Sequence, residues 1–258
     1  MIGRLKLLSS AYIQEYTLQA GIDWMELYRS LRLKESFTHE DFSYYLISAS
    51  VESSRIEGNT LSLDDYLRNT QFNIKSKPRD MAEINDLLSA YQFAVAHRLT
   101  RKNFLRCHKL SSATILDIPA HRGRLRQSQV GIYGSGKLVY MAIDHKGLKP
   151  VFDKLFDDIS ALIESDLTAG EVFYYAAMIH LLFEKVHPFA DGNGRTGRLL
   201  EKWFLAEKIG TAAWSIASEK YYMEHRHDYY RALEIGMDYD SIDWDKCLPF
   251  LLLLTKAL

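Results

Sequence analysis

The hydrophobic positions of this chain recur mostly at the three- and four-residue intervals of an α-helix. Helices are predicted over Asp80–Ala96, over Leu148–Ile163, and from near Asp41 to Glu57, where Gly58 supplies a C-cap. The apolar run Leu248–Leu254, broken only by Pro249, is too short to span a bilayer and predicts a buried terminal helix. The clearest stripe places seven side chains on one helical face: Val172, Tyr175, Ala176, Ile179, Leu182, Phe183 and Val186.

One segment has the pattern of strands instead. Two β-prone runs, Gln127–Tyr133 and Lys137–Met141, flank the glycine-rich turn Gly134–Gly136 and predict a β-hairpin. An isolated strand pair is only marginally stable, so it must pack on the helices or join a third strand. The predicted fold class is therefore mainly α with one β-hairpin. No linker forces a second domain, although a soft seam is expected near Lys75–Arg79.

Composition and charge narrow the functional classes. The chain has 258 residues, a formal net charge of -1 and 47% hydrophobic residues, which is ordinary for a globular protein with a sizeable core. Direct nucleic-acid or membrane binding usually needs a basic excess, so neither is expected. Cys107 and Cys247 form no metal-binding cluster. Two reduced thiols and no secretory signal indicate a cytoplasmic protein.

The most informative segment, His187–Arg198, directly follows the periodic stripe. Pro188 disfavours helical geometry at His187, and a helical pattern resumes at about Arg195. The sequence therefore predicts that His187–Gly194 is a loop between two helices.

The residues of this loop suit the chemistry of phosphates. Backbone N–H groups of Gly192–Gly194 at a helix start are open to an anion, and the helix dipole favours negative charge there. Arg195 and Arg198 are three residues apart and can face one polyphosphate. Asp191 offers a hard oxygen ligand for Mg²⁺, and His187 titrates near neutrality and can act as a general base. The loop thus predicts phosphoryl-type transfer.

A glycine-rich loop with structural arginines is the simpler interpretation. It explains the glycines but not why a histidine, an aspartate and two arginines share one loop. The segment is neither a P-loop, because GxxxxGK[ST] is missing, nor an HExxH metalloprotease motif.

The segment His187–Arg198 resembles the signature of the Fic family, HxFx[DE]GNGRxxR, at every defined position. Upstream, Ser53–Gly58 resembles the inhibitory motif [ST]xxxE[GN] of that family. The resemblance covers most of the chain and implies one Fic-type helical bundle, with an N-terminal region over about residues 1–78 and the core over about 79–258. The hairpin stands where the family has its target-binding flap, with candidate contact residues Val130, Gly131, Ile132 and Tyr133. A later segment resembles the R..YY..L pattern of the family through Arg226, Tyr229, Tyr230 and Leu233.

This resemblance implies a protein adenylyltransferase, which moves AMP from ATP onto a Tyr, Ser or Thr hydroxyl of a target protein and releases pyrophosphate. In Fic enzymes the motif histidine deprotonates the target hydroxyl, a role that falls to His187 here. The acidic residue holds Mg²⁺ on the nucleotide, which assigns Asp191. The outer phosphates would meet an anion hole and two arginines: Gly192, Asn193, Gly194, Arg195 and Arg198.

The inhibitory motif implies autoinhibition from within the same chain. In the family the inhibitory glutamate pairs with the second motif arginine and obstructs the γ-phosphate; the corresponding residues are Glu57 and Arg198. Ser53 lies four residues before Glu57 on one helix, so its hydroxyl is expected to orient the carboxylate. Without the core motif, Glu57 would be interpreted as an ordinary exposed acid at a helix end.

Other interpretations remain open at this stage. The same fold could transfer another nucleotide or a phosphate, or remove AMP with Glu57 as base, and a non-catalytic regulator or toxin–antitoxin module is the alternative from another class. A homodimer also stays open. His180 is expected in the core, and His108 is expected to be structural. His225 and His227 fit either the nucleobase end of the site or the solvated surface. The pairs Tyr221–Tyr222 and Tyr229–Tyr230 fit either an adenine pocket or helix packing.

Overall fold

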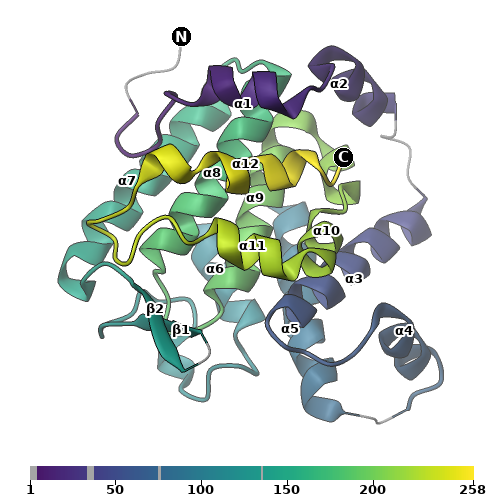
Figure 1. Cartoon of the computed structure of the whole chain (residues 1–258). Coiled ribbons are helices and arrows are strands. Elements are labelled where there is room, and N and C mark those ends of the chain that lie inside the picture. The colour runs from purple at the N-terminus through teal and green to yellow at the C-terminus, as the bar shows by residue number, and fades with distance from the viewer. Residues whose placement is uncertain (1–4, 34–37, 75–76, 135) are drawn as a thin grey trace.

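The protein is built almost entirely from helices. A computed structural model describes residues 5–33, 38–74, 77–134 and 136–258. Within these ranges it contains twelve α-helices and one two-stranded antiparallel sheet, so the predicted fold class is confirmed (Figure 1). The helices are α1 (Ile13–Ala20), α2 (Trp24–Leu33), α3 (His39–Ile56), α4 (Leu63–Gln71), α5 (Pro78–Ala96), α6 (Arg101–Ser111), α7 (His145–Glu164), α8 (Ala169–Val186), α9 (Asn193–Ile209), α10 (Ser218–Glu224), α11 (Arg226–Ala232) and α12 (Leu248–Thr255).

Helices α8 and α9 form the centre of the molecule. Helix α8 begins with a capping box, in which Thr168 accepts from the backbone of Glu171 while the Glu171 carboxylate accepts from the backbone of Thr168. The sequence predicts one apolar face for this helix, but every residue from Val172 to Val186 is buried. The reason is that α1, α7, α9 and α12 pack around it, and a helix apolar on nearly all sides is a core helix.

The other predicted helices are present with longer bounds. Helix α7 begins at His145, three residues before the predicted start, because the Asp144 side chain caps the Lys146 backbone N–H. Helix α3 ends at Ile56 and is followed by Gly58 at a φ of 97°, as the predicted C-cap requires. Of the predicted seam near Lys75–Arg79, residues 75 and 76 lie outside the described residues.

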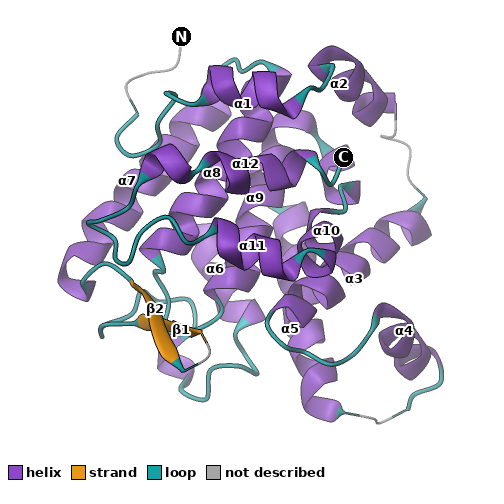
Figure 2. Cartoon of the chain, viewed as in Figure 1, coloured by secondary structure: helices purple, strands orange, loops and turns teal. Residues whose placement is uncertain are grey.

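The predicted hairpin is also present, with shorter strands (Figure 2). Strand β1 (Gly131–Gly134) pairs with β2 (Lys137–Met141), with an irregularity between Ile132 and Tyr133. The predicted first run began at Gln127, but Gln127–Val130 lie outside the strand. The predicted turn includes Ser135, which lies outside the described residues.

A short third segment stabilises the hairpin, as expected for an otherwise marginal strand pair. Met141 donates its backbone N–H to Met237 at 2.9 Å and accepts from Tyr239 at 3.2 Å. At the base of the hairpin, Ala142 donates to the Val130 carbonyl at 3.1 Å. One edge of β2 is therefore engaged near Met141 by the chain that follows α11.

Helix α3 belongs to the same packed body as the central helices. It lies against α5, α9 and α10, and its residues Leu46 and Ile56 are part of the main buried cluster. A second, smaller apolar cluster joins α3 to α4 and α5 through Val51, Tyr66 and Ile84. None of the helices in the described ranges is long and apolar enough to cross a membrane.

Candidate active site

The loop between α8 and α9 is shorter than the sequence predicts. Helix α9 begins at Asn193 rather than near Arg195, because Gly192 adopts a φ of 81° and turns the chain directly into the helix. The Asn193 side chain braces this turn: it accepts from the Phe189 N–H at 2.9 Å and donates to the Phe189 carbonyl at 3.0 Å. The contribution of Asn193 to an anion site can therefore come only from its backbone.

His187 stands at the end of α8 in a left-handed conformation, with φ 47° and ψ 61°. Its backbone N–H donates to Phe183 at 2.9 Å, and ring atom Nδ1 lies 3.4 Å from the Glu184 carbonyl. Burial lowers the pKa of His187 to about 4, against an opposing effect of that carbonyl. The sequence expectation of titration near neutrality does not hold for this half-buried ring, because the surrounding protein removes water from it. The imidazole is neutral at physiological pH, and no described residue pairs with Nε2.

The Glu57 carboxylate lies against the N-terminus of α9. A Cβ built on Gly194 would collide with Oε1 of Glu57, so only glycine allows this approach. The first N–H groups of a helix have no intrahelical acceptor and attract anions. The carboxylate therefore occupies the position that the sequence assigns to a phosphate.

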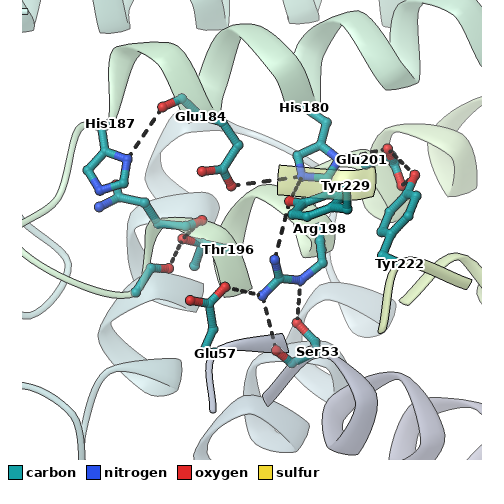
Figure 3. Close-up of polar contacts among 12 residues, drawn as sticks. Ser53, Glu57, His180, Glu184, His187, Thr196, Arg198, Glu201, Tyr222 and Tyr229 are labelled. Atoms are coloured by element: carbon teal, nitrogen blue, oxygen red, sulfur yellow. Dashed lines mark hydrogen bonds and ion pairs between the residues drawn. The ribbon is translucent and has the colours of Figure 1, made fainter. Parts of the chain in front are cut away.

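Arg198 is the second partner of Glu57, as the sequence predicts (Figure 3). The guanidinium is fully buried, and its Nη2 lies 2.7 Å from Oε1 of Glu57. Burial would raise the pKa of Glu57, but the charges of Arg198 and Arg195 outweigh it and hold this pKa below its usual value. Burial likewise opposes the charge of Arg198, yet Tyr229, Glu57 and Glu184 together raise its pKa above the ordinary one. Both groups are charged at neutral pH.

Ser53 contacts this ion pair from the arginine side, which corrects the sequence expectation. Its hydroxyl accepts from Nε of Arg198 at 2.8 Å and its carbonyl from Nη2 at 3.0 Å, so the hydroxyl orients the guanidinium rather than the Glu57 carboxylate. Ser53 is buried on the face of α3 that packs on α9, whereas Glu57 lies just beyond the last helical residue. The end of α3 is held further by Tyr230, whose hydroxyl donates to the Ile56 carbonyl at 3.1 Å.

Arg195 points to a different carboxylate. Its Nη2 lies 3.3 Å from Glu83 of α5, which also contacts Arg79 at 3.4 Å. The Arg195 Nε is buried and has no hydrogen-bond partner within the described part of the chain. Both motif arginines are thus paired with carboxylates from the N-terminal third of the chain.

Glu57 separates two hollows. The first, of about 490 Å³, is lined by His187 and Arg198, by both strands of the hairpin, and by Tyr229, Tyr230 and Leu233. The second, of about 320 Å³, is lined by Asp191, Arg195 and Glu83. Because Glu57 lines both, a ligand that extends from one hollow to the other would lie against its carboxylate.

Asp191 fits the expected role of a Mg²⁺ ligand in one respect. Its carboxylate is exposed in the second hollow, and its only described hydrogen bond is to the N–H of Gly192 at 2.6 Å. No group of three or more His, Cys, Asp or Glu side chains in the described ranges is arranged to hold a metal by itself. One carboxylate supplemented by substrate phosphates is a common Mg²⁺ site, so the donor set fits an ion that arrives with a nucleotide.

His108 supports the motif loop from behind. Its ring stacks on Phe189 at 3.6 Å, Nδ1 accepts from the Gly123 N–H, and Nε2 donates to the Asp191 carbonyl at 2.9 Å. Burial lowers the pKa of His108 to about 4, so the neutral ring keeps this donor and acceptor pattern. The hydrogen bonds agree with the structural role that the sequence predicts for His108.

A buried polar network extends from Arg198 into the core (Figure 3). Arg198 contacts the Tyr229 hydroxyl at 3.3 Å, which lies 3.1 Å from Nε2 of His180, and Nδ1 of His180 lies 2.8 Å from Glu201. Tyr222 donates to the same Glu201 carboxylate. His180 is therefore a core residue, as predicted, that also holds a partner of Arg198.

The sequence did not settle which tyrosines and histidines line the site. The pair Tyr229–Tyr230 lines the first hollow, whereas Tyr222 is in the core network and Tyr221 stacks on His225 elsewhere. His225 and His227 are exposed and do not line the site. Glu83 and the buried Arg126, which bonds to the motif loop, were not identified from the sequence. Only tertiary packing distinguishes them from the other acids and arginines near them.

Comparisons with known proteins show which proteins this chain resembles. Residues 98–205 match the model of the Fic/DOC family. The protein adenylyltransferase Fic of Aedes aegypti is 29% identical over 205 residues, which cover 72% of this chain and 36% of the relative. The protein adenylyltransferase fic-1 of Caenorhabditis briggsae is 29% identical over 157 residues, which cover 56% of this chain and 29% of the relative. The chain thus spans about a third of the length of these curated relatives.

A solved structure shares the fold over nearly the whole chain. The crystal structure of a Fic family protein from Desulfovibrio desulfuricans G20 superposes with a TM-score of 0.77 at 23% identity, covering 99% of this chain and 74% of that protein. The similarity includes the N-terminal helices as well as the segment that matches the family model.

Proposed function

We propose that this chain is a protein adenylyltransferase that uses Mg²⁺-ATP, because residues 98–205 match the model of the Fic/DOC family. The observation that carries the proposal is the first hollow, where a neutral histidine, a buried arginine and a helix N-terminus meet beside an open strand. The names of the curated relatives support the same reaction class.

In the proposed reaction, the target hydroxyl attacks the α-phosphorus of ATP. Nε2 of His187 accepts the hydroxyl proton as the new P–O bond forms, and the bond to the bridging oxygen breaks to release pyrophosphate. The N–H groups at the start of α9 and the guanidinium of Arg198 stabilise the negative charge that develops on the phosphates. Mg²⁺, held by Asp191 and the phosphates, would neutralise further charge.

We further propose that Glu57 inhibits this reaction. Its carboxylate lies where a terminal phosphate would pair with Arg198, and its negative charge repels that phosphate. ATP bound beside Glu57 would have its α-phosphorus poorly aligned for attack, and a small misplacement can lower a rate by about 10²-fold. Ser53 and Tyr230 keep the end of α3 in position for this contact.

Removal of AMP by water, with Glu57 as the base, is the second candidate. It is less favoured because the neighbouring arginines hold the pKa of Glu57 below its usual value. A carboxylate that binds a proton so weakly is a poor general base while Arg198 remains its partner.

The test compares the wild type with the variants Glu57→Gly, Arg198→Ala and His187→Ala under identical Mg²⁺-ATP. Transfer of label from α-labelled ATP to lysate proteins or to the chain itself is measured, together with ATP affinity. Glu57→Gly should raise transfer, because the phosphate position is freed. Arg198→Ala should lower it although it breaks the same ion pair, because Arg198 serves both states.

His187→Ala in the Glu57→Gly background is the control for chemistry. It should bind ATP normally and lose about 10²–10⁴-fold in transfer rate, as expected for a missing general base. No gain from Glu57→Gly in a folded, ATP-binding protein would refute autoinhibition. Near-full transfer by the His187 variant would refute the assigned base. Release of AMP from a labelled protein by the wild type alone would favour the second candidate.

A further inference from the structure

Arg126 is a buried cation whose acceptors are all backbone carbonyls. Its side chain is 5% exposed, and in the part of the chain that the structure describes its guanidinium donates to three carbonyl oxygens. Nε donates to His187 at 2.9 Å, Nη1 to Ser128 at 2.8 Å, and Nη2 to Ile143. Burial lowers the pKa of Arg126, although Asp144 partly opposes this effect. Burying a guanidinium without a carboxylate bonded to it is costly, so its position calls for an explanation.

Two of these carbonyls lie at the ends of the hairpin, and the third lies on the distant motif loop. His187 is the histidine of the motif loop, Ser128 leads into β1, and Ile143 follows β2. The backbone N–H of Arg126 adds a bond to the Pro188 carbonyl at 2.9 Å. Arg126 therefore joins both ends of the hairpin directly to the backbone of the motif loop.

The contact with His187 is made at a strained residue. A left-handed φ is uncommon for a residue other than glycine and persists only where its surroundings fix it. The His187 N–H donates to the Phe183 carbonyl, and the His187 carbonyl accepts from Arg126. Both backbone polar groups of His187 are therefore held. Since the backbone sets where the imidazole points, the Arg126 bond also sets the position of the ring.

Resting on the adenylyltransferase function proposed above, we propose that Arg126 is a positioning residue that holds the hairpin and the His187 imidazole in one fixed geometry. A target segment docked on β1 is then placed relative to the base through Arg126, because the same guanidinium ties down the strand ends and the loop. A guanidinium carries its donors on three separate nitrogen atoms in a rigid plane, and here each nitrogen donates to a different carbonyl, whereas a lysine offers its three donors from one nitrogen atom.

The transfer test uses full-length Glu57→Gly as the parent, with Arg126→Met and Arg126→Lys added to it. Methionine keeps much of the length without donors or charge, and lysine keeps the charge without the fork. Both variants should lose about tenfold or more in the rate of label transfer to lysate proteins at saturating ATP, since misplacing reactants by about 1 Å can cost 10²-fold. Their KM for ATP should change by less than about twofold, because Arg126 does not face the phosphate site.

Arg122→Met is the matched control. Arg122 also donates from Nε and Nη2 to a backbone carbonyl, that of Leu116, at 3.0 and 2.7 Å, but it contacts neither the motif loop nor the hairpin. It should leave transfer and KM unchanged. A full rate in Arg126→Lys would show that charge alone suffices and would overturn the proposal. The proposal would also be overturned if the Arg126 variants lost transfer and ATP affinity equally, or if Arg122→Met lost as much transfer as they do. Either result would indicate a general role of Arg126 in folding.

A second readout does not depend on transfer. The His187 ring signal, assigned by its loss in His187→Ala, is titrated by NMR in the wild type and in the Arg126 and Arg122 variants. If Arg126 fixes the ring, its signal should shift and broaden in Arg126→Lys, which keeps the charge, but not in Arg122→Met. An unchanged His187 signal in Arg126→Lys would overturn the proposal even if the parent transfers no label. If the parent transfers no label but the His187 signal shifts in Arg126→Lys, the adenylyltransferase function is refuted and the positioning role of Arg126 stands.

Discussion

The low pKa of the half-buried His187 ring has a kinetic consequence for its proposed role as the base. A protonated imidazole has no lone pair for the target proton, so activity follows the neutral form. An ordinary histidine with a pKa of about 6.5 is mostly charged at pH 5.5. Burial lowers the pKa of His187 to about 4 and keeps the ring neutral at that pH. We therefore expect kcat/KM for ATP of Glu57→Gly to vary by less than about twofold between pH 8 and pH 5.5.

The measurement is a pH–rate profile of label transfer by Glu57→Gly at low ATP. ATP affinity, determined at each pH, corrects for protonation of the nucleotide itself. A decline centred near pH 6.5 that the affinity does not explain would contradict the expected environment of His187. The wild type should show no gain over the same range, because the pKa of Glu57 lies below its usual value and the carboxylate stays paired with Arg198.

Single residues differ in how far the sequence reveals them. The Glu57–Arg198 pair was predictable because both motifs resemble those of the Fic family, in which the corresponding residues pair, and the structure confirms the contact. The partner of the Ser53 hydroxyl was predicted wrongly, since four-residue spacing on a helix does not say which neighbouring helix supplies a better donor. The contacts of Arg126 bring together the two ends of the hairpin and the motif loop, and no sequence pattern encodes such an arrangement.

At the scale of elements, the hairpin has one open edge at the site. Val130 and Ala142 form a hydrogen-bonded pair, so by alternation Gly131 and Met141 face outward on opposite edges. Met141 is engaged by Met237 and Tyr239, whereas no described residue pairs with the backbone of Gly131. We expect a target segment to add to β1 at Gly131 by strand addition.

Substituting proline for Gly131 tests this edge. Gly131→Pro removes the outward N–H and should lower target labelling by about 5-fold or more, the order of one or two lost hydrogen bonds, without changing ATP affinity. The control is Gly131→Ala, which meets the same Leu138 side chain but keeps the donor. Equal losses in both variants would point to crowding at Leu138 rather than to a missing backbone donor.

The periodicity of hydrophobic residues predicted where helices and strands lie but not the residues at which they begin and end. The stripe that ends at Val186 predicts α8 well because its apolar pattern is strong. The start of α9 was placed too late, since the sequence cannot show that Gly192 turns in a left-handed conformation and that Asn193 braces the loop. The first strand was placed too early because Gln127–Val130 have strand propensity but lack a partner along most of their length.

At the scale of the whole molecule, one buried carboxylate binds the backbone of residues 6–8 near the N-terminus to helix α7. Asp158 of α7 is 2% exposed and accepts from the backbone of Lys6, Leu7 and Leu8 at 2.7, 2.7 and 2.9 Å. Asp158→Asn replaces one acceptor by a donor and should lower the free energy of unfolding by about 1–3 kcal/mol. The shift in the urea midpoint measures this loss.

The neighbouring Asp157→Asn is the matched control. Asp157 is exposed and bonds only the Lys6 side chain in the described chain, so its loss should leave the midpoint unchanged. Label transfer by Glu57→Gly should survive Asp158→Asn at temperatures where the protein stays folded, because none of these groups contacts the motif loop. A lower urea midpoint in Asp157→Asn equal to that in Asp158→Asn would contradict the special role of the buried carboxylate.

The position of Glu57 at the end of a helix in the same packed body has a consequence for dosage. An inhibitor on a separate chain dissociates as both proteins are diluted, so its effect depends on how much of each the cell makes. A carboxylate carried by α3 meets Arg198 within one molecule, and dilution cannot separate them. Under the inhibition proposed for Glu57, changes in expression level would leave the inhibited fraction constant. Activity would then respond to events that compete for Arg198 or loosen the end of α3.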